Sequence, residues 1–151
     1  DALDRLRHLP YEKIPGARVD HHRSLRQGIP EVVFAEGKTA AETASIARTL
    51  FEKSGRVLVT RADAEDAGVL RRTLEAAGAR RIEHNPRGRT VTAHRGRGPR
   101  PSGRILIVTA GTSDIPVAEE ARVTAEFLGS RTETAYDVGV AGLHRILDRR
   151  E

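Results

Sequence analysis

Cysteine is absent from this chain of 151 residues. The sequence therefore offers no disulfide bond, no thiolate metal site and no cysteine nucleophile. Long apolar runs are also missing, because no stretch approaches the roughly 18 consecutive apolar residues that a membrane helix needs. No secretory signal is recognisable at the start of the sequence. These absences favour a cytoplasmic protein without a membrane partner.

Aromatic residues are scarce as well, at 3% of the chain, and apolar residues reach 38%. Any hydrophobic core must therefore consist mostly of Val, Leu, Ile and Ala. Only 3 of the 26 basic residues are lysines, and the formal net charge is +5. A basic balance favours anionic partners, and small molecules that carry phosphate satisfy it as well as nucleic acid does.

The sequence RILIVTAGTSD at residues 104–114 is the most informative stretch. Its apolar run, rich in β-branched residues, predicts a strand buried on both faces. A small, hydroxylic loop follows, and Ser113 or Asp114 can cap a helix predicted at 117–128, with Pro116 in its first turn. A strand that leads through such a loop into a helix N-terminus can bind an anion. The alternative is a well-capped turn without a ligand.

Alternation of apolar runs and capped helical patterns predicts an α/β fold. Thr39 and Glu42 form a capping box sequence for the second predicted helix. The predicted strands lie near 32–35, 57–60, 80–84, 90–94, 104–109 and 133–138, and the predicted helices span 1–9, 40–53, 64–77, 117–128 and 143–151. We expect the strands on either side of helix 40–53 to be parallel, and those at 80–84 and 90–94 to form a hairpin.

Three parts are predicted along the chain: an N-terminal α/β domain at 1–95, a linker at 96–103 and a second unit at 104–151. The linker, GRGPRPSG, is rich in glycine and proline. Residues 80–104 hold eight arginines and one acidic residue, Glu83. We favour a solvated hairpin and linker over a nucleic-acid arm, because no aromatic residues are interleaved for base stacking. Two strands and two helices cannot cover a parallel sheet, so we expect a fragment cut at both ends.

Four charged residues in the first half, Arg23, Arg26, Glu31 and Lys38, are candidates for a cluster that grips a carboxylate or a phosphate. An ordinary set of surface ion pairs is the alternative. The adjacent pair His21 and His22 does not predict a metal site, because no second cluster of ligands follows at a useful spacing.

His144 and Arg145 follow the strand predicted at 133–138, as the loop at 111–114 follows the strand before it. Ligands of open α/β sheets bind at the carboxyl ends of adjacent strands. Arg145 could grip a phosphate with two hydrogen bonds, and His144 could move a proton near neutral pH. A surface pair at a helix start is the alternative.

Together these motifs resemble the LarB family of nickel-pincer cofactor biosynthesis proteins, which contain a PurE-like (aminoimidazole ribonucleotide carboxylase-like) domain. In the second half the resemblance rests on VTAGTSDIPVAEEA at 108–121 and on YDVGVAGLHR at 136–145. In the first half it rests on Asp20, Arg23, Arg26, Gly28, Pro30, Glu31, Val32, Val33, Glu36, Gly37, Lys38 and Thr39.

The resemblance implies that residues 104–151 begin a PurE-like domain, a flavodoxin-like, three-layer fold with a parallel sheet, with its first βαβα unit. It maps the substrate-phosphate site onto Gly111, Thr112, Ser113 and Asp114 and onto His144 and Arg145, with His144 as the candidate catalytic residue. The charged cluster of Arg23, Arg26, Glu31 and Lys38 completes the set of candidate substrate-binding residues.

The implied reaction carboxylates nicotinic acid adenine dinucleotide at C5 of the pyridinium ring and hydrolyses its phosphoanhydride, which releases AMP. CO2 or bicarbonate is the co-substrate, Mg²⁺ stays open as a cofactor, and the full-length protein is expected to be a homo-oligomer. The family uses a cysteine nucleophile that this chain lacks, so we expect the chain alone to be inactive. Two alternatives stay open: a PurE-type carboxylase or mutase in purine biosynthesis, and a basic nucleotide- or nucleic-acid-binding module.

Overall fold

The structure, a computed structural model, describes residues 11–14, 17–20 and 31–139. Two short strands, β1 (Tyr11–Ile14) and β2 (Ala17–Asp20), pair antiparallel at the start of this part. The remaining elements are β3 (Val33–Phe34), α3 (Ala40–Ser54), β4 (Arg56–Thr60), α4 (Ala64–Ala76), β5 (Arg81–Asn85), β6 (Thr90–His94), β7 (Arg104–Val108), the 3-10 turn η1 (Thr112–Asp114), α5 (Ile115–Leu128) and β8 (Arg131–Ala135). The predicted α/β class is confirmed. The helices predicted at 1–9 and 143–151 lie outside the described residues.

Local capping explains where α3 and α4 begin. The Thr39 side chain accepts a hydrogen bond from the backbone of Glu42, and the Glu42 carboxylate accepts one from Thr39, as the capping box predicted. Asp63 and Asp66 form the same reciprocal pair at the start of α4. At the end of α3, Gly55 adopts a left-handed conformation with φ +69°.

Strands β3, β4, β6 and β5 form one sheet in that order. β3 and β4 are parallel, as the strand–helix–strand pattern predicted. β5 and β6 pair antiparallel as the predicted hairpin, and β6 also pairs antiparallel with β4. These predicted boundaries hold to within one or two residues.

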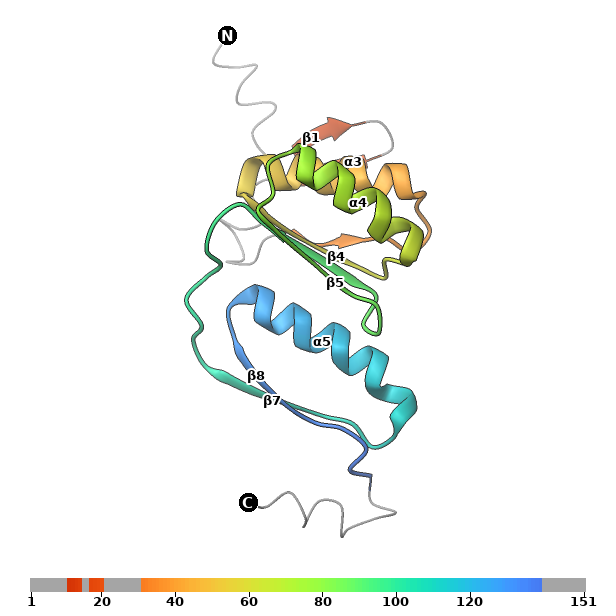
Figure 1. Ribbon diagram of the computed structural model, residues 1–151, viewed down its shortest axis with the longest axis vertical. Helices are drawn as coiled ribbons and strands as arrows, with labels where there is room; N and C mark the ends of the chain where they lie inside the picture. Colours follow the sequence, from red (N-terminus) through yellow and green to blue (C-terminus); the bar gives the residue numbers. More distant parts are fainter. Residues whose placement is uncertain (1–10, 15–16, 21–30, 140–151) are drawn as a thin grey trace.

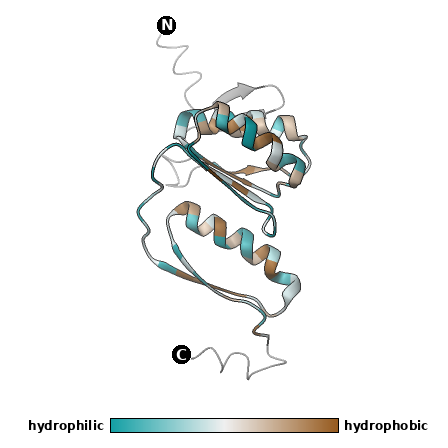
Figure 2. Cartoon of the chain, viewed as in Figure 1, coloured by the Kyte–Doolittle hydropathy of each residue, from teal (hydrophilic) through white to brown (hydrophobic). Residues whose placement is uncertain are grey.

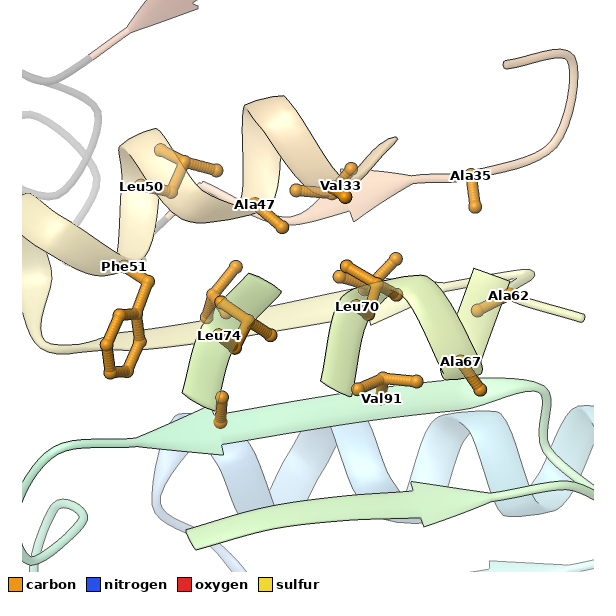
Figure 3. Close-up of a cluster of buried hydrophobic side chains, with 14 residues drawn as sticks. Val33, Ala35, Ala47, Leu50, Phe51, Ala62, Ala67, Leu70, Leu74 and Val91 are labelled. Atoms are coloured by element: carbon orange, nitrogen blue, oxygen red, sulfur yellow. The ribbon is translucent and has the colours of Figure 1, made fainter. Parts of the chain in front are cut away.

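The main hydrophobic core lies between this sheet and the two helices α3 and α4, which both cover the same face (Figure 1). Leu70 and Leu74 of α4 are completely buried there, next to Phe51 of α3 (Figure 3). From the strands, Val57, Val59, Val91 and Ala93 point into the same cluster. The core is aliphatic apart from Phe51, as the composition required.

The second half contains a parallel pair, β7 and β8, with α5 between them in sequence. The strand predicted at 133–138 lies instead at Arg131–Ala135, so that prediction was wrong by two to three residues. The strand starts directly after Gly129 closes α5, and Arg131 pairs with Arg104. Beyond the strand, Asp137 has a positive φ of 59°, which no extended strand accommodates.

The predicted burial of β7 on both faces is also wrong for the described chain. Leu106 and Val108 are 61% and 56% exposed, and Ile105 is 41% exposed. Side chains alternate across a strand, and α5 covers only one face of the two-stranded sheet (Figure 1). An apolar run thus shows that a strand forms, whereas the helices that cover its faces determine its burial.

Helix α5 lies between the two sheets, below the four-stranded sheet in Figure 1 and on the face opposite α3 and α4. Figure 2 shows that it carries both hydrophobic and hydrophilic residues along its length. Near its end, the Phe127 ring lies 5.6 Å from the His94 ring, and the Arg56 guanidinium lies 5.2 Å from the Phe127 centroid. Residues 96–103 connect the two halves without helix or strand.

Candidate functional site

The loops that follow β7 and β8 lie in direct contact. The Oγ1 atom of the buried Thr109 accepts a hydrogen bond from the Asp137 N–H at 3.1 Å. The Val138 N–H donates to Thr109 O at 3.0 Å, and the Gly139 N–H donates to Ala110 O at 2.9 Å. The carboxyl ends of two parallel strands therefore bring these loops to one edge of the sheet.

Gly139 allows this close approach. A Cβ atom at this position would lie 2.6 Å from Ala110 O, closer than any ordinary contact. A side chain here would push the second loop away from the first. The packing therefore requires glycine because of space, and this glycine has no positive φ.

Gly111 begins the loop at residues 111–114, which leads through η1 into α5. Asp114 stands at the cap position of α5, but its side chain makes no capping bond there and instead accepts a hydrogen bond from the Gly111 N–H at 3.2 Å. Asp114 is thus the cap residue by position, as predicted, but its carboxylate stabilises its own loop and not the first turn of α5. Pro116 lies in the first turn, as predicted, although α5 starts at Ile115.

Thr112 and Ser113 present the free donors of this loop. Both residues are exposed, and within the described part of the chain neither hydroxyl forms a hydrogen bond. The positive end of α5 adds to the potential at the same place. Chemically, the loop can bind an anion or a sugar hydroxyl, but none of its side chains is a strong nucleophile.

His144 and Arg145 lie outside the described residues, so their place beside this loop stays a prediction. The described chain reaches Gly139, next to Ala110, before these two residues follow in sequence. The last described residues thus lie at the edge of the sheet where the sequence predicts the shared site.

Of the other predicted cluster, which consists of Arg23, Arg26, Glu31 and Lys38, the structure describes only Glu31 and Lys38. Arg23, Arg26 and the pair of histidines before them lie outside the described residues. Glu31 is half-buried, and the Lys38 ammonium donates a hydrogen bond to Phe34 O at 2.8 Å. Lys38 precedes α3, which lies on the opposite face of the four-stranded sheet from α5 (Figure 1). The structure therefore does not bring Glu31 and Lys38 together with the loop at 111–114.

Glu119 on α5 forms a network that the sequence did not predict. Its carboxylate accepts hydrogen bonds from the Arg122 guanidinium at 2.8 Å, from Asn85 Nδ2 at 2.5 Å and from the Tyr136 hydroxyl at 2.5 Å. These bonds, above all those from Arg122, lower the pKa of Glu119 from 4.5 to about 2. Burial and the neighbouring Glu119 carboxylate raise the pKa of Tyr136.

The network joins three segments that are distant in sequence. Asn85 ends β5, and Tyr136 follows β8. The spacing of Glu119 and Arg122 on one helix could have suggested a pair, but nothing in the sequence pattern points to Asn85. Glu119 therefore ties α5 to the hairpin on one side and to the loop after β8 on the other.

Residues 11–95 match the family described as LarB/PurE-like N-terminal domain. The chain belongs to the LarB/PurE-like family. An uncharacterized protein of Methanocaldococcus jannaschii is 39% identical to it over 140 residues. This similarity covers 90% of the chain, so it extends past the family match into the segment that contains the loop at 111–114, and it covers 54% of the relative. The chain thus spans about half the length of that relative.

Two further findings concern the described part of this LarB/PurE-like chain. It contains no group of three His, Cys, Asp or Glu side chains placed to hold a metal ion. Among its helices, none combines the length and the apolar character that crossing a membrane requires.

Proposed function

We propose that this chain serves the LarB-type synthase reaction of nickel-pincer cofactor biosynthesis. That reaction carboxylates nicotinic acid adenine dinucleotide at pyridinium C5 and hydrolyses its phosphoanhydride, with release of AMP. Membership of the LarB/PurE-like family supports an enzymatic role. The observation that carries the proposal is the exposed, hydroxylic loop at 111–114, which lies at the start of α5 and beside the loop after β8.

In this proposal each residue at the carboxyl ends of β7 and β8 has a defined role. The Thr112 and Ser113 hydroxyls bind a phosphate of the dinucleotide, with the positive end of α5 behind them. Asp114 keeps the loop in shape through the Gly111 N–H and offers its other oxygen to a ribose hydroxyl. Arg145 adds a guanidinium to the phosphate, and His144 transfers the proton that hydrolysis requires.

Ring carboxylation needs a further group. The pyridinium C5 atom is electron-poor and does not attack CO2 until a nucleophile has added to the ring, for which the family resemblance implies a thiolate. The 151 residues contain no cysteine. We therefore propose that turnover needs residues beyond this sequence, and that the chain supplies binding groups.

The same proposal includes the co-substrate, a candidate cofactor and the compartment. CO2 or bicarbonate is the carboxyl donor, Mg²⁺ is the candidate cofactor, and the reaction takes place in the cytoplasm. The full-length protein would work as a homo-oligomer.

Binding titrations test this function. The chain is titrated with nicotinic acid adenine dinucleotide, aminoimidazole ribonucleotide and single-stranded DNA at two salt concentrations. We expect saturable binding of the dinucleotide, and Thr112→Ala with Ser113→Ala should weaken it by at least about a hundredfold, since hydrogen bonds to charged groups contribute about 1.5–3 kcal/mol each and about 1.4 kcal/mol is a factor of ten. Ser45→Ala with Thr49→Ala on α3, which removes the same groups elsewhere, should leave the affinity unchanged.

The three ligands distinguish the candidate functions. Preference for aminoimidazole ribonucleotide would favour a PurE-type carboxylase or mutase instead. Binding of DNA with a steep salt dependence and no preference among the small ligands would favour a basic binding module, because such dependence reports released counterions.

A further inference from the structure

A cavity of about 1140 Å³ lies at the face of the four-stranded sheet that is opposite α3 and α4. Its walls come from the hairpin β5–β6, from residues 95–99 after it and from the last turns of α5. The loop at 111–114 precedes the first turn of α5, whereas the residues of α5 that line the cavity begin at Arg122. Eight residue steps from Asp114 to Arg122 correspond to roughly 12 Å along the helix axis, and none of the residues at 111–114 lines the cavity, so it is separate from the predicted phosphate site.

Basic side chains dominate the lining of this cavity. The arginines are Arg80, Arg81, Arg95, Arg97 and Arg122, and the only acidic residues among the lining residues are Glu83 and Glu126. Both carboxylates are already engaged, Glu83 by Arg81 and Glu126 by Arg122. Within the described chain, the guanidinium groups of Arg80 and Arg97 form no ion pair or hydrogen bond. The cavity thus has two cations that no anion among the described residues neutralises.

The sheet contributes a polar wall. Because side chains alternate along β6, Val91 and Ala93 enter the main core, whereas Thr90, Thr92 and His94 occupy the other face and line the cavity. Thr90 is 1% exposed, and its Oγ1 atom has no hydrogen-bond partner among the described residues. A buried hydroxyl without a partner costs free energy unless a ligand or a water molecule satisfies it.

The positive potential reaches His94. Burial lowers the pKa of this imidazole, and the nearby charges of Arg81 and Arg56 lower it further. His94 therefore favours its neutral form in the empty cavity and can accept or donate a hydrogen bond there.

We propose that this cavity is a second anion site, which binds a small molecule carrying phosphate groups between Arg80 and Arg97. Arginine suits this role because its planar guanidinium donates two parallel hydrogen bonds to phosphate oxygens. A small ligand fits better than nucleic acid, because the site is a concave space between two layers. Its one phenyl ring, that of Phe127, is 3% exposed and presents no stacking surface.

Isothermal titration of the whole 151-residue chain with inorganic pyrophosphate tests this site. We expect Arg80→Gln with Arg97→Gln to weaken binding at least about tenfold, since two charge-assisted contacts are lost. Neither guanidinium has a hydrogen bond or an ion pair with another described residue, so the fold should be unaffected. The control is Arg71→Gln with Arg72→Gln on α4, across the sheet. It makes the same change in net charge and should leave the affinity within about twofold, since distant surface charges are screened.

Two further measurements distinguish this cavity from the predicted phosphate site at 111–114. Thr112→Ala with Ser113→Ala should leave the pyrophosphate affinity of the Arg80 and Arg97 site unchanged, and pyrophosphate should move the ring signals of His94 in an NMR spectrum. Equal loss in the α4 control, or no saturable pyrophosphate binding, would overturn the proposal. Single-stranded DNA that binds through Arg80 and Arg97 while pyrophosphate does not compete would overturn it in favour of a nucleic-acid surface.

Discussion

Glu119 shows how one carboxylate can connect the two halves of this chain. Its hydrogen bonds reach Asn85 in the four-stranded sheet and Tyr136 after β8, and Arg122 holds it from its own helix. The side chain is mostly buried, at 15% exposure. Loss of its charge therefore weakens the hydrogen bonds from three segments at once, which costs more than the loss of a surface pair.

Glu119→Gln should lower the free energy of unfolding by about 1–2 kcal/mol at pH 7, since a charged acceptor of several hydrogen bonds is replaced by a neutral amide. Urea denaturation measures this change. The control Glu133→Gln breaks the exposed pair with Arg104 and should cost less than about 0.5 kcal/mol. Equal effects of the two substitutions would contradict the role of Glu119.

The same residue predicts a dependence on pH. The pKa of Glu119 is lowered in the folded chain to about 2 from 4.5, so its contribution to stability is complete above pH 4.5 and is lost as the pH falls toward 2. Urea denaturation of the parent chain and of Glu119→Gln at pH 7, 4 and 3 should show the difference between them shrinking with acidity. A difference that stays constant across this range would exclude the linkage.

Gly139 is the second residue whose effect can be predicted. Gly139→Ala places a Cβ where Ala110 O lies 2.6 Å away, so the loops after β7 and β8 must separate. We expect a destabilisation of about 1–3 kcal/mol, the usual cost of overpacking, measured by thermal or urea unfolding. Gly96→Ala is the matched control, because a Cβ at Gly96 meets nothing within 4 Å. Unchanged stability of Gly139→Ala would show that the second loop packs differently.

At the scale of single elements, helix α3 begins at Ala40 because of local hydrogen bonds rather than because of packing. Thr39→Ala removes the side-chain acceptor for the Glu42 N–H and should cost about 1 kcal/mol of stability. Thr49→Ala on the same helix is the control. Among the described residues its hydroxyl donates to Ser45 O alone, within the helix, so alanine there should be nearly neutral. Chemical denaturation of both variants shows whether the loss of stability comes from the missing cap or from replacing any threonine of this helix by alanine.

Helix α5 illustrates the opposite case, an element whose role depends on its neighbours. One side of it covers β7 and β8, and the other meets the hairpin β5–β6 (Figure 1). At Gly88 in the hairpin turn, a Cβ would lie 2.8 Å from the Glu120 backbone nitrogen. The hairpin and α5 therefore approach too closely for a side chain at that turn.

At the scale of the whole molecule, we expect the 151-residue chain to bind nicotinic acid adenine dinucleotide without carboxylating it. The chain has no thiolate to add to the ring, and hydroxyls and histidines are weaker nucleophiles at neutral pH. Incubation with the dinucleotide and labelled bicarbonate, followed by measurement of AMP and fixed label, tests this expectation. Turnover equal to that of a longer form of the protein would show that a cysteine-dependent mechanism is wrong here.

The sequence alone determined most of the secondary structure and the family. Capping boxes such as Thr39 with Glu42 act within four residues, and the turn between β5 and β6 is equally local, so their signals are visible in the sequence. The hydroxylic loop at 111–114 was recognisable for the same reason. Its contact with the loop after β8 followed from the rule that parallel strands end at the same edge.

Only the tertiary structure decided burial, the start of β8 and the contacts across α5. The apolar run of β7 is the same whether or not a helix covers each face, and its exposure depends on elements that pack against it. The Asn85–Glu119 bond and the cavity beside Arg80 and Arg97 join residues far apart along the chain. Periodicity and capping report neighbours within a few residues, whereas these features arise because folding brings α5 onto the second face of the sheet.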